Sequence, residues 1–466
     1  MPDRSLCSTR RQFIKGVSLS TAATLMATPA VASSAASAVT STAPARAKNL
    51  IFLVVDGLCA GTLGLAHHWQ LRHKTLPLNW MQLYSVPGVY RAQQDTASAS
   101  SPVTDSAAAA SAWGGGQRVH NGSINMSEAG HMQEPILIRA KKAGKATGLV
   151  STCRITHATP AGFAANVPQR NSEDVIARQY LEREIDVLLG GGARYFKTDD
   201  LVAQYEAKSY GIARDTKQLG ALAGSPKLLG LFSESHMPYR IDRLYDSSYA
   251  ATPGLPEMFQ TAVQSLESNR EGFVLQVEAG RVDHAGHVND PATILHEFLE
   301  FDTCIGLALD YQQANPDTLL IVTTDHGTGG CQLNGLGAAY KDSAPALDRI
   351  NDSTRSFEWL QDRFMKTGLF DAAVLEEMIG INVTPEKAAQ IQAAIDLPVQ
   401  YLSSTMTALL QEELMAQTAI GWTSNNHTAE CVDFMARGPG AENLLPFIRN
   451  DAVFNFMTEA LGLRQV

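Results

Sequence analysis

The sequence has few cysteines, and they form neither a disulfide framework nor a metal-binding pattern. Six occur among 466 residues, and five of them lie beyond the N-terminal segment. An odd, widely spaced set does not predict paired disulfides, and no two have the C-x-x-C spacing typical of thiolate zinc sites. We expect most of them to be small buried residues. The five are Cys59, Cys153, Cys304, Cys331 and Cys431.

Positive charge is also scarce. Lys and Arg number 37 against 47 Asp and Glu, which gives a formal net charge of −10. No basic block occurs outside the N-terminus. Because proteins hold nucleic-acid phosphates mainly with Lys and Arg, we do not expect nucleic acid as a partner.

Long apolar runs are missing as well, including at the N-terminus. Residues 8–16, "STRRQFIKG", contain an Arg-Arg pair, and a weakly apolar Ala/Ser/Thr-rich stretch follows over 17–32. Small residues typical of cleavage sites end at Ala32 and Ala38. The order of these features favours a twin-arginine signal over residues 1–38 rather than a chance Arg pair. The stretch is too short and too polar for a stable membrane span. We therefore expect a bacterial chain exported by the twin-arginine machinery to the periplasm or beyond.

Short apolar runs that end in a polar or glycine-rich turn recur along the rest of the chain. Helix-period stretches separate them, such as 292–311 with its apolar stripe from Ile294 to Leu309. This alternation predicts an α/β three-layer sandwich, in which helices flank a large, mostly parallel central sheet. In such sheets the chemistry lies at the carboxyl ends of the strands. The expected strands lie within 49–57, 146–152, 185–192, 227–233, 272–280, 318–327 and 431–439.

Helical patterns replace the strands from about residue 331 to residue 423. Thr384 followed by Pro385 is one expected helix start within this region. We predict a helical insertion into one catalytic domain that spans residues 48–466. Its natural position would be over the strand ends, as a lid or an interaction surface.

Acidic residues and histidines occur at four of the expected strand ends. Taken singly, each has a structural alternative: Asp56 could cap the next helix, and histidine is common in cores and on surfaces. Together they form a mixed nitrogen and oxygen set that suits Zn²⁺, with a separate all-oxygen position that suits Mg²⁺. The set is Asp56, Glu278, Asp283, His287, Asp325, His326 and His427, and His284 lies beside Asp283 at the same strand end. We expect the other histidines to be structural or surface residues: His67, His68, His73, His120, His131, His236 and His296.

Three serines, Ser101, Ser106 and Ser111, lie in or beside an alanine-rich stretch that begins "SPVTDSAAAASAW". A serine hydroxyl is a poor nucleophile at neutral pH and needs a base or a metal ion to activate it. The chain has no G-x-S-x-G motif and no S-x-x-K motif around these serines. Activation by a metal ion is therefore the chemistry that this sequence offers.

Several of these pieces, in this order, resemble the alkaline phosphatase family. The resemblance covers roughly residues 48–330 and 420–440, and it implies hydrolysis of phosphate monoesters through a phosphoserine at two zinc ions and one magnesium ion. The late His427 belongs to the pattern. The other pieces are "VVDG", "VTDSAAAASAW", "THATP", "VEAGRVDHAGH" and "TTDHGTGG".

The resemblance also implies a role for individual residues. The serine of the family's D-S-A sequence would be Ser106, with Arg170 binding the phosphate and Asp105 orienting that arginine. The metal ligands that it implies are Asp283, His287 and His427 for the first zinc, Asp325, His326 and the shared Asp56 for the second, and Thr159 and Glu278 with Asp56 for magnesium.

Two positions differ from the best-known enteric bacterial form of the family. His157 and His284 stand where that form has Asp and Lys, and both are what the animal enzymes carry. The resemblance therefore implies weaker phosphate retention, a more easily lost magnesium and a more alkaline optimum. A phosphodiesterase or another hydrolase of the same superfamily stays the alternative. The physiological substrate and a homodimer are left open.

Overall fold

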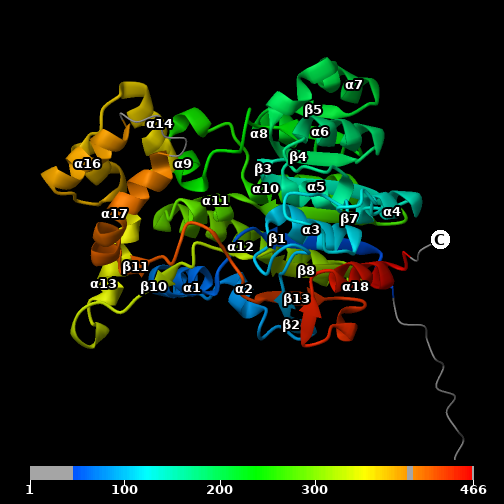
Figure 1. Ribbon diagram of the computed structural model, residues 1–466. Coiled ribbons are helices and arrows are strands. Elements are labelled where there is room, and N and C mark those ends of the chain that lie inside the picture. Colours follow the sequence, from blue (N-terminus) through cyan, green and yellow to red (C-terminus); the bar gives the residue numbers. More distant parts are fainter. Residues whose placement is uncertain (1–45, 396–401, 464–466) are drawn as a thin grey trace, which may run out of the picture. The chain divides into compact units, whose positions relative to one another are not determined.

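A ten-stranded sheet forms the centre of the computed structural model, which describes residues 46–395 and 402–463 (Figure 1). The strands of this sheet are β1 (Asn49–Val55), β2 (Val89–Asp95), β3 (Ala146–Arg154), β4 (Val187–Gly191), β5 (Gly211–Ala213), β6 (Leu228–Leu231), β7 (Phe273–Ala279), β8 (Thr318–Thr324), β13 (Val432–Arg437) and β14 (Phe447–Arg449). Their order is β14-β2-β13-β8-β1-β7-β3-β4-β6-β5. Only β13 is antiparallel to its neighbours, so the predicted mostly parallel sheet is confirmed.

Three strands gave no apolar signal in the sequence. Most side chains of β2 are exposed or partly exposed, so it has no continuous apolar run. β5 and β14 are only three residues long. The sheet is therefore wider than the sequence alone predicts.

Helices cover both faces of the sheet, as the fold class predicts. These helices are α1 (Ala60–Lys74), α2 (Asn79–Gln82), α3 (Ser106–Gly115), α4 (Ile136–Lys142), α5 (Ala158–Ala164), α6 (Glu173–Glu182), α7 (Leu201–Ala207), α8 (Thr216–Ala221), α9 (Arg240–Tyr245), α10 (Leu255–Leu266), α11 (Arg281–His287), α12 (Pro291–Ala314) and α18 (Ala452–Leu461). Short 3₁₀ turns occur at 193–196, 198–200, 247–249, 338–340, 349–352 and 441–443.

The alternation of side chains along β1 divides the apolar core into two layers. Ile51, Leu53 and Val55 pack in the layer that contains α1, α10 and α12. Leu50, Phe52 and Val54 pack in the layer that contains α3, α5 and α18. The apolar stripe expected on α12 is buried from Ile294 to Ile305, and Leu309 packs partly buried against the same layer.

Parallel pairing brings the carboxyl ends of four strands to one edge of the sheet. β1 lies between β7 and β8, and β7 also pairs with β3. Val54 is in register with Glu278 of β7 and with Thr323 of β8. Asp56 and Asp325 each follow directly after their strand, so the fold gathers three carboxylates at this edge.

Small residues let α3 and α5 approach each other closely. All ten residues of α3 are buried. A Cβ added to Gly114 would lie 2.0 Å from the carbonyl oxygen of Gly162 on α5, so no larger residue fits there. Asp105 caps the start of α3 by accepting a hydrogen bond from the amide of Ala108 at 2.9 Å. This cap and the close packing fix Ser106 as the first residue of the helix.

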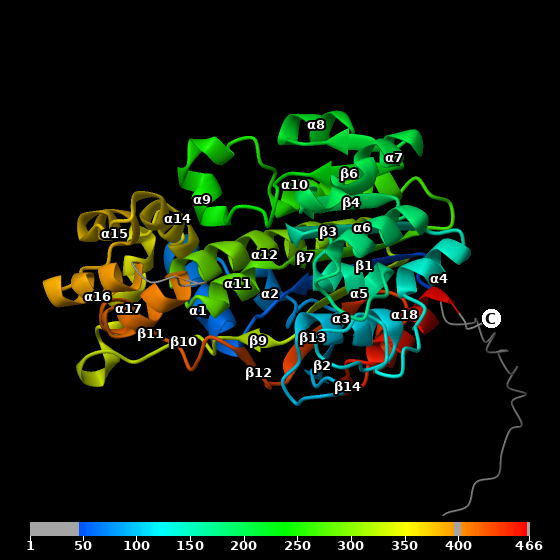
Figure 2. The same ribbon diagram turned by 45° about the horizontal axis from the view of Figure 1, so that its top comes forward.

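Between β10 (Gln332–Leu333) and β11 (Ile420–Gly421) the described chain is helical, and we call its main part, residues 343–418, the helical segment. It has its own apolar cluster, which includes Phe357 and Leu410. One helix begins at Pro385, as the sequence predicts. Figures 1 and 2 show the segment, in yellow to orange, at the opposite end from α18. Its helices are α13 (Ser343–Asp348), α14 (Phe357–Thr367), α15 (Ala372–Ile379), α16 (Pro385–Ile395) and α17 (Leu402–Thr418).

Two smaller features complete the fold. The paired two-residue strands β9 (Gly327–Thr328) and β12 (His427–Thr428) bring two distant segments together. Four of the five cysteines beyond the N-terminal segment are buried, and Cys431 is exposed. Among the described residues, no helix has the length and hydropathy needed to cross a membrane.

We predict that Phe52→Ala destabilises the protein far more than Phe447→Ala. The Phe52 ring is fully buried, with its centroid 5.2 Å from Trp113 and 5.1 Å from Phe163. Removing such a ring costs about 3–5 kcal/mol of unfolding free energy. Phe447 lies on the edge strand and is 53% exposed. Urea denaturation of both variants measures the difference, and equal midpoints would contradict the assignment of Phe52 to the core.

Candidate active site

Asp283, His287 and His427 form the first group of possible metal ligands. Asp283 and His287 lie on α11, and His427 lies on β12. The two imidazole Nε2 atoms are 3.1 Å apart. The Asp283 carboxylate lies 3.3 Å from Nε2 of His287 and 3.5 Å from Nε2 of His427. One acidic and two imidazole groups therefore converge on one point.

Hydrogen bonds to the backbone fix the orientation of both imidazoles. Nδ1 of His287 donates to the carbonyl of Asn425 at 2.6 Å, and Nδ1 of His427 donates to the carbonyl of Thr104 at 2.8 Å. A carbonyl oxygen only accepts, so in the neutral rings both Nε2 atoms carry lone pairs. A proton or a metal cation between the two Nε2 atoms would remove the repulsion of their lone pairs.

The pKa values of this group show how strongly its members interact. Burial alone would raise the pKa of Asp283, but His287 and His427 hold it well below its usual range. Burial alone would lower the pKa of His287, but the Asp283 carboxylate raises it to about 9. Burial and the neighbouring His326 lower the pKa of His427 to about 4.

Asp56, Asp325 and His326 form a second, fully buried group. Nε2 of His326 lies 3.1 Å from the Asp325 carboxylate and 3.5 Å from the Asp56 carboxylate. The Oγ of Ser106 lies 3.4 Å from the same nitrogen. Asp56 does not cap the following helix, because the capping position of α1 is Cys59. The alternative that Asp56 only caps the next helix is therefore wrong.

Asp56, Thr159 and Glu278 form a third group, whose donors are all oxygens. The Thr159 hydroxyl lies 3.4 Å from the second carboxylate oxygen of Asp56. One oxygen of Glu278 accepts a hydrogen bond from Ser151. Burial raises the pKa of Glu278 to about 7. Burial and the carboxylates of Asp325, Asp283 and Glu278 raise the pKa of Asp56 well above its usual range.

These groups fit divalent cations, on the evidence of their unpartnered atoms. One oxygen each of Asp56, Asp325 and Glu278 is buried and accepts no hydrogen bond, and those of Asp56 and Asp325 share Nε2 of His326 as their one close charged neighbour. Leaving a buried charge without a partner costs several kcal/mol. A divalent cation offsets this cost by giving these oxygens a partner. The nitrogen and oxygen groups suit zinc, and the all-oxygen group suits magnesium.

Arg170 lies across the pocket from these groups and is held from two sides. Its Nη1 donates to Asp105 at 2.9 Å, and its Nη2 donates to Nε2 of His157 at 3.1 Å. Asp105 thus both caps α3 and fixes the arginine. Burial and the adjacent Arg170 lower the pKa of His157 well below its usual range, so this imidazole is neutral.

Two further arginines each donate to a histidine and to a carboxylate. Arg154 pairs with Glu173 at 2.7 Å and hydrogen-bonds Nε2 of His236. Arg281 donates to Nδ1 of His284 at 2.8 Å and to Glu358 at 2.8 Å. With Asp105, Arg170 and His157, the site therefore contains three chains of carboxylate, arginine and imidazole.

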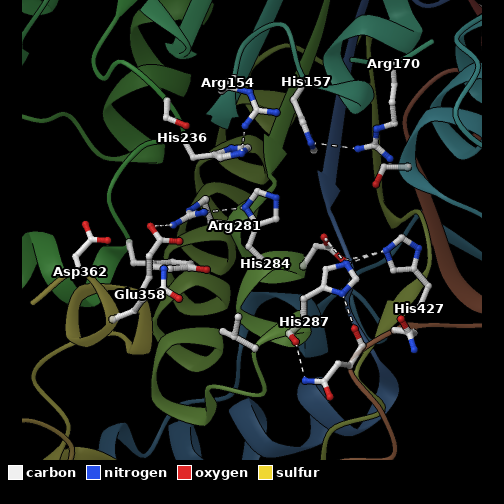
Figure 3. Close-up of a pocket in the computed structure, with 18 residues that line it drawn as sticks. Arg154, His157, Arg170, His236, Arg281, His284, His287, Glu358, Asp362 and His427 are labelled. Carbon is white, nitrogen blue, oxygen red and sulfur yellow. Dashed lines mark hydrogen bonds and ion pairs between the residues drawn. The ribbon is translucent and has the colours of Figure 1, made fainter. Parts of the chain in front are cut away.

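A cavity of about 870 Å³ is lined by Ser106 and by the three arginines, Arg154, Arg170 and Arg281. Figure 3 shows Arg154, His157 and Arg170 along one side and His287 and His427 along another. Glu358 and Asp362, from α14 of the helical segment, line the remaining part. Basic groups and metal-ligating groups thus face one space that is large enough for a small phosphorylated molecule.

The structure brings together every site residue that the sequence predicts, but it adds one histidine. His236 lines the pocket, and its ring centroid lies 4.3 Å from His284 and 5.3 Å from His157. The expectation that His236 lies outside the site is therefore wrong. Its position shortly after the end of β6 could have placed it at the site, because the chemistry of such sheets lies at the carboxyl ends of the strands.

Comparisons with known proteins agree with this geometry. A family model described as alkaline phosphatase matches residues 47–463. Alkaline phosphatase 3 of Bacillus subtilis (strain 168) is 30% identical over 432 residues, which cover 89% of this chain and 89% of that protein. Alkaline phosphatase 4 of the same strain is 32% identical over 366 residues, 77% of each chain. The crystal structure of Thermus thermophilus alkaline phosphatase is 35% identical, has a TM-score of 0.83, and covers 91% of this chain and 93% of that one.

We predict that His427→Ala lowers the divalent metal content of the purified protein. The variant removes one of three convergent donors from the first group. Elemental analysis after gel filtration measures the bound metal. His131→Ala is the matched control, because His131 is exposed and lies outside every donor group found in the described residues. Equal metal contents in wild type and His427→Ala would contradict the assignment.

Proposed function

Because this chain belongs to the alkaline phosphatase family of phosphate ester hydrolases, we propose that it hydrolyses phosphate monoesters to an alcohol and inorganic phosphate. We propose that the reaction passes through a covalent phosphoserine at Ser106. The observation that carries this proposal is the position of Ser106, whose hydroxyl lies 3.4 Å from Nε2 of His326 in the second group and lines the same pocket as Arg170.

We propose that two zinc ions and one magnesium ion are the resident cofactors. Bound there, the cations supply Lewis-acid stabilisation of the serine alkoxide and of the phosphoryl oxygens. The ligands are Asp283, His287 and His427 for one zinc, Asp56, Asp325 and His326 for the other, and Asp56, Thr159 and Glu278 for magnesium.

Ser106 performs the covalent step. Its oxygen attacks phosphorus, a phosphoserine forms, and the bond from phosphorus to the alcohol oxygen breaks. Water then attacks the same phosphorus, the bond to Ser106 breaks, and inorganic phosphate leaves. Ser106 is the first residue of a ten-residue helix, whose N-terminal dipole favours an incoming phosphate.

Arg170 orients the phosphoryl group throughout these steps. One N–H of each terminal nitrogen is engaged, by Asp105 and by His157. The second N–H of each nitrogen is left for two phosphoryl oxygens, which matches the bidentate geometry of arginine. Because Asp105 and His157 already hold the guanidinium, little rotational freedom is lost when the substrate binds.

The alternative function is hydrolysis of phosphodiesters by the same groups. A diester carries less negative charge than a monoester dianion, so the charge-assisted hydrogen bonds of Arg170 favour the monoester. We also propose export by the twin-arginine machinery to the periplasm or the medium. This proposal is based on residues 1–38, which lie outside the described residues.

We predict that the protein hydrolyses p-nitrophenyl phosphate in preference to bis-p-nitrophenyl phosphate. Ser106→Ala is expected to lower kcat on the monoester by about 10³-fold or more, because the nucleophile is lost. Ser111→Ala is the control on the same helix. Its hydroxyl binds the backbone of Ala107 and Asn125, away from the pocket. A preference for the diester, or full turnover by Ser106→Ala, would overturn the proposal.

We predict that chelation abolishes the monoesterase activity and that zinc with magnesium restores it. Removing the cations leaves the Asp56, Asp325 and Glu278 oxygens without partners and the Ser106 hydroxyl without activation. Adding zinc alone or magnesium alone to the chelated protein, at pH 7 and at pH 10, measures how much monoesterase activity each metal restores. Recovery by magnesium alone, or full activity after complete removal of metal, would contradict the two-zinc assignment.

A further inference from the structure

Arg281 connects the active-site pocket to the helical segment. Its Nη1 donates to Nδ1 of His284 at 2.8 Å, and its Nη2 donates to Glu358 of α14 at 2.8 Å. Glu358 and Arg281 are 77 positions apart in the sequence. In the other two carboxylate, arginine and imidazole chains of the pocket, the carboxylate comes from outside the helical segment.

The surroundings of Arg281 hold its guanidinium in one place. Its side chain is 3% exposed, and the guanidinium carbon lies 3.6 Å from the centre of the Tyr239 ring. Within the described ranges, Glu358 is the one carboxylate that forms an ion pair with Arg281. Removing Glu358 would therefore leave a buried guanidinium without its counter-charge.

Arg281 determines which nitrogen of His284 carries the proton. A guanidinium only donates hydrogen bonds, so Nδ1 of His284 must accept and Nε2 must carry the hydrogen. His284 lines the same pocket as Ser106 (Figure 3). The ring therefore offers one N–H donor to the pocket, on the side away from Arg281.

The start of α14 is anchored beside Glu358. The Ser356 amide and hydroxyl donate to Asp242 at 2.9 and 2.7 Å, and the Phe357 amide donates to Asp290 at 2.8 Å. All of these groups are buried. The backbone that carries Glu358 is thus fixed to the sheet domain, although Glu358 itself is 49% exposed.

We propose that Glu358 is a positioning residue for the phosphatase reaction. Through Arg281, it holds His284 in the Nε2-protonated form, in which the ring donates a hydrogen bond to a phosphoryl oxygen or to the water that attacks it. This inference rests on the proposed function. It gives the helical segment a part in the chemistry, beyond covering the pocket.

The test uses the metal-loaded mature protein with ¹⁵N-labelled histidine, and the variants Glu358→Ala and Glu358→Gln. In wild type we expect the His284 nitrogen spectrum to show protonated Nε2, assigned by comparison with His284→Asn. In Glu358→Ala we expect the His284 spectrum to show a mixture of protonation forms in place of the Nε2-protonated form alone. Glu358→Gln is expected to keep most of it, because the amide oxygen still accepts from Arg281.

Kinetics supply the second measurement. Glu358→Ala is expected to lower kcat/KM about tenfold, by the same factor for small and large alcohols, because His284 acts at the phosphate. Glu377→Ala is the matched control, because Glu377 is an exposed carboxylate on α15 of the helical segment and does not line the pocket. We expect it to change neither measurement.

Two results would overturn the inference. One is an unchanged His284 spectrum in Glu358→Ala, and the other is a loss of kcat/KM that depends on the alcohol, which would make Glu358 a substrate contact. The spectrum needs no substrate. An inactive wild type would therefore reject the proposed function, and the spectrum alone would then decide whether Glu358 controls His284.

Discussion

The concentration of buried carboxylates at one sheet edge is the constraint on which the rest of the structure depends. Asp56, Glu278, Asp283 and Asp325 are all almost completely inaccessible, and burial together with the charges of the other three raises the pKa of Asp56 well above its usual range. Burying this many like charges is costly without counter-charge beside them, and a divalent cation would offset that cost. The parallel strand register gathers the carboxylates, and backbone carbonyls orient two histidines beside them.

Three arginines that line the same pocket present the reverse problem, which is buried positive charge. Arg154, Arg170 and Arg281 are mostly buried cations, and each is paired with a carboxylate and a neutral imidazole. Burial and the neighbouring guanidinium groups keep the imidazoles uncharged, so they add no further positive charge. The pocket thus presents the Asp283 carboxylate and pre-oriented N–H donors to one space.

The sequence predicts the part of the site that follows from local patterns. Asp56 and Asp325 come directly after apolar strands, and parallel strands place their carboxyl ends at one edge, so their meeting could be foreseen. The residues that pair with the arginines could not be predicted from the sequence. Arg281 binds Glu358 across 77 positions, and that contact depends on how the helical segment packs. The sequence does not predict β2 either, because the exposed side chains of this strand give it no apolar run.

The alanine-rich helix shows why one stretch can carry both fold and chemistry. The side of α3 that faces α5 must be made of small residues, because Gly114 meets the α5 backbone and Ala110 lies against Gly162. That close packing leaves no freedom at its first residue, Ser106. Asp105 then serves two structures at once, since one oxygen caps α3 and the other holds Arg170. Ser106 and Arg170, the proposed nucleophile and the proposed phosphate-binding residue, are consequently linked through a single carboxylate.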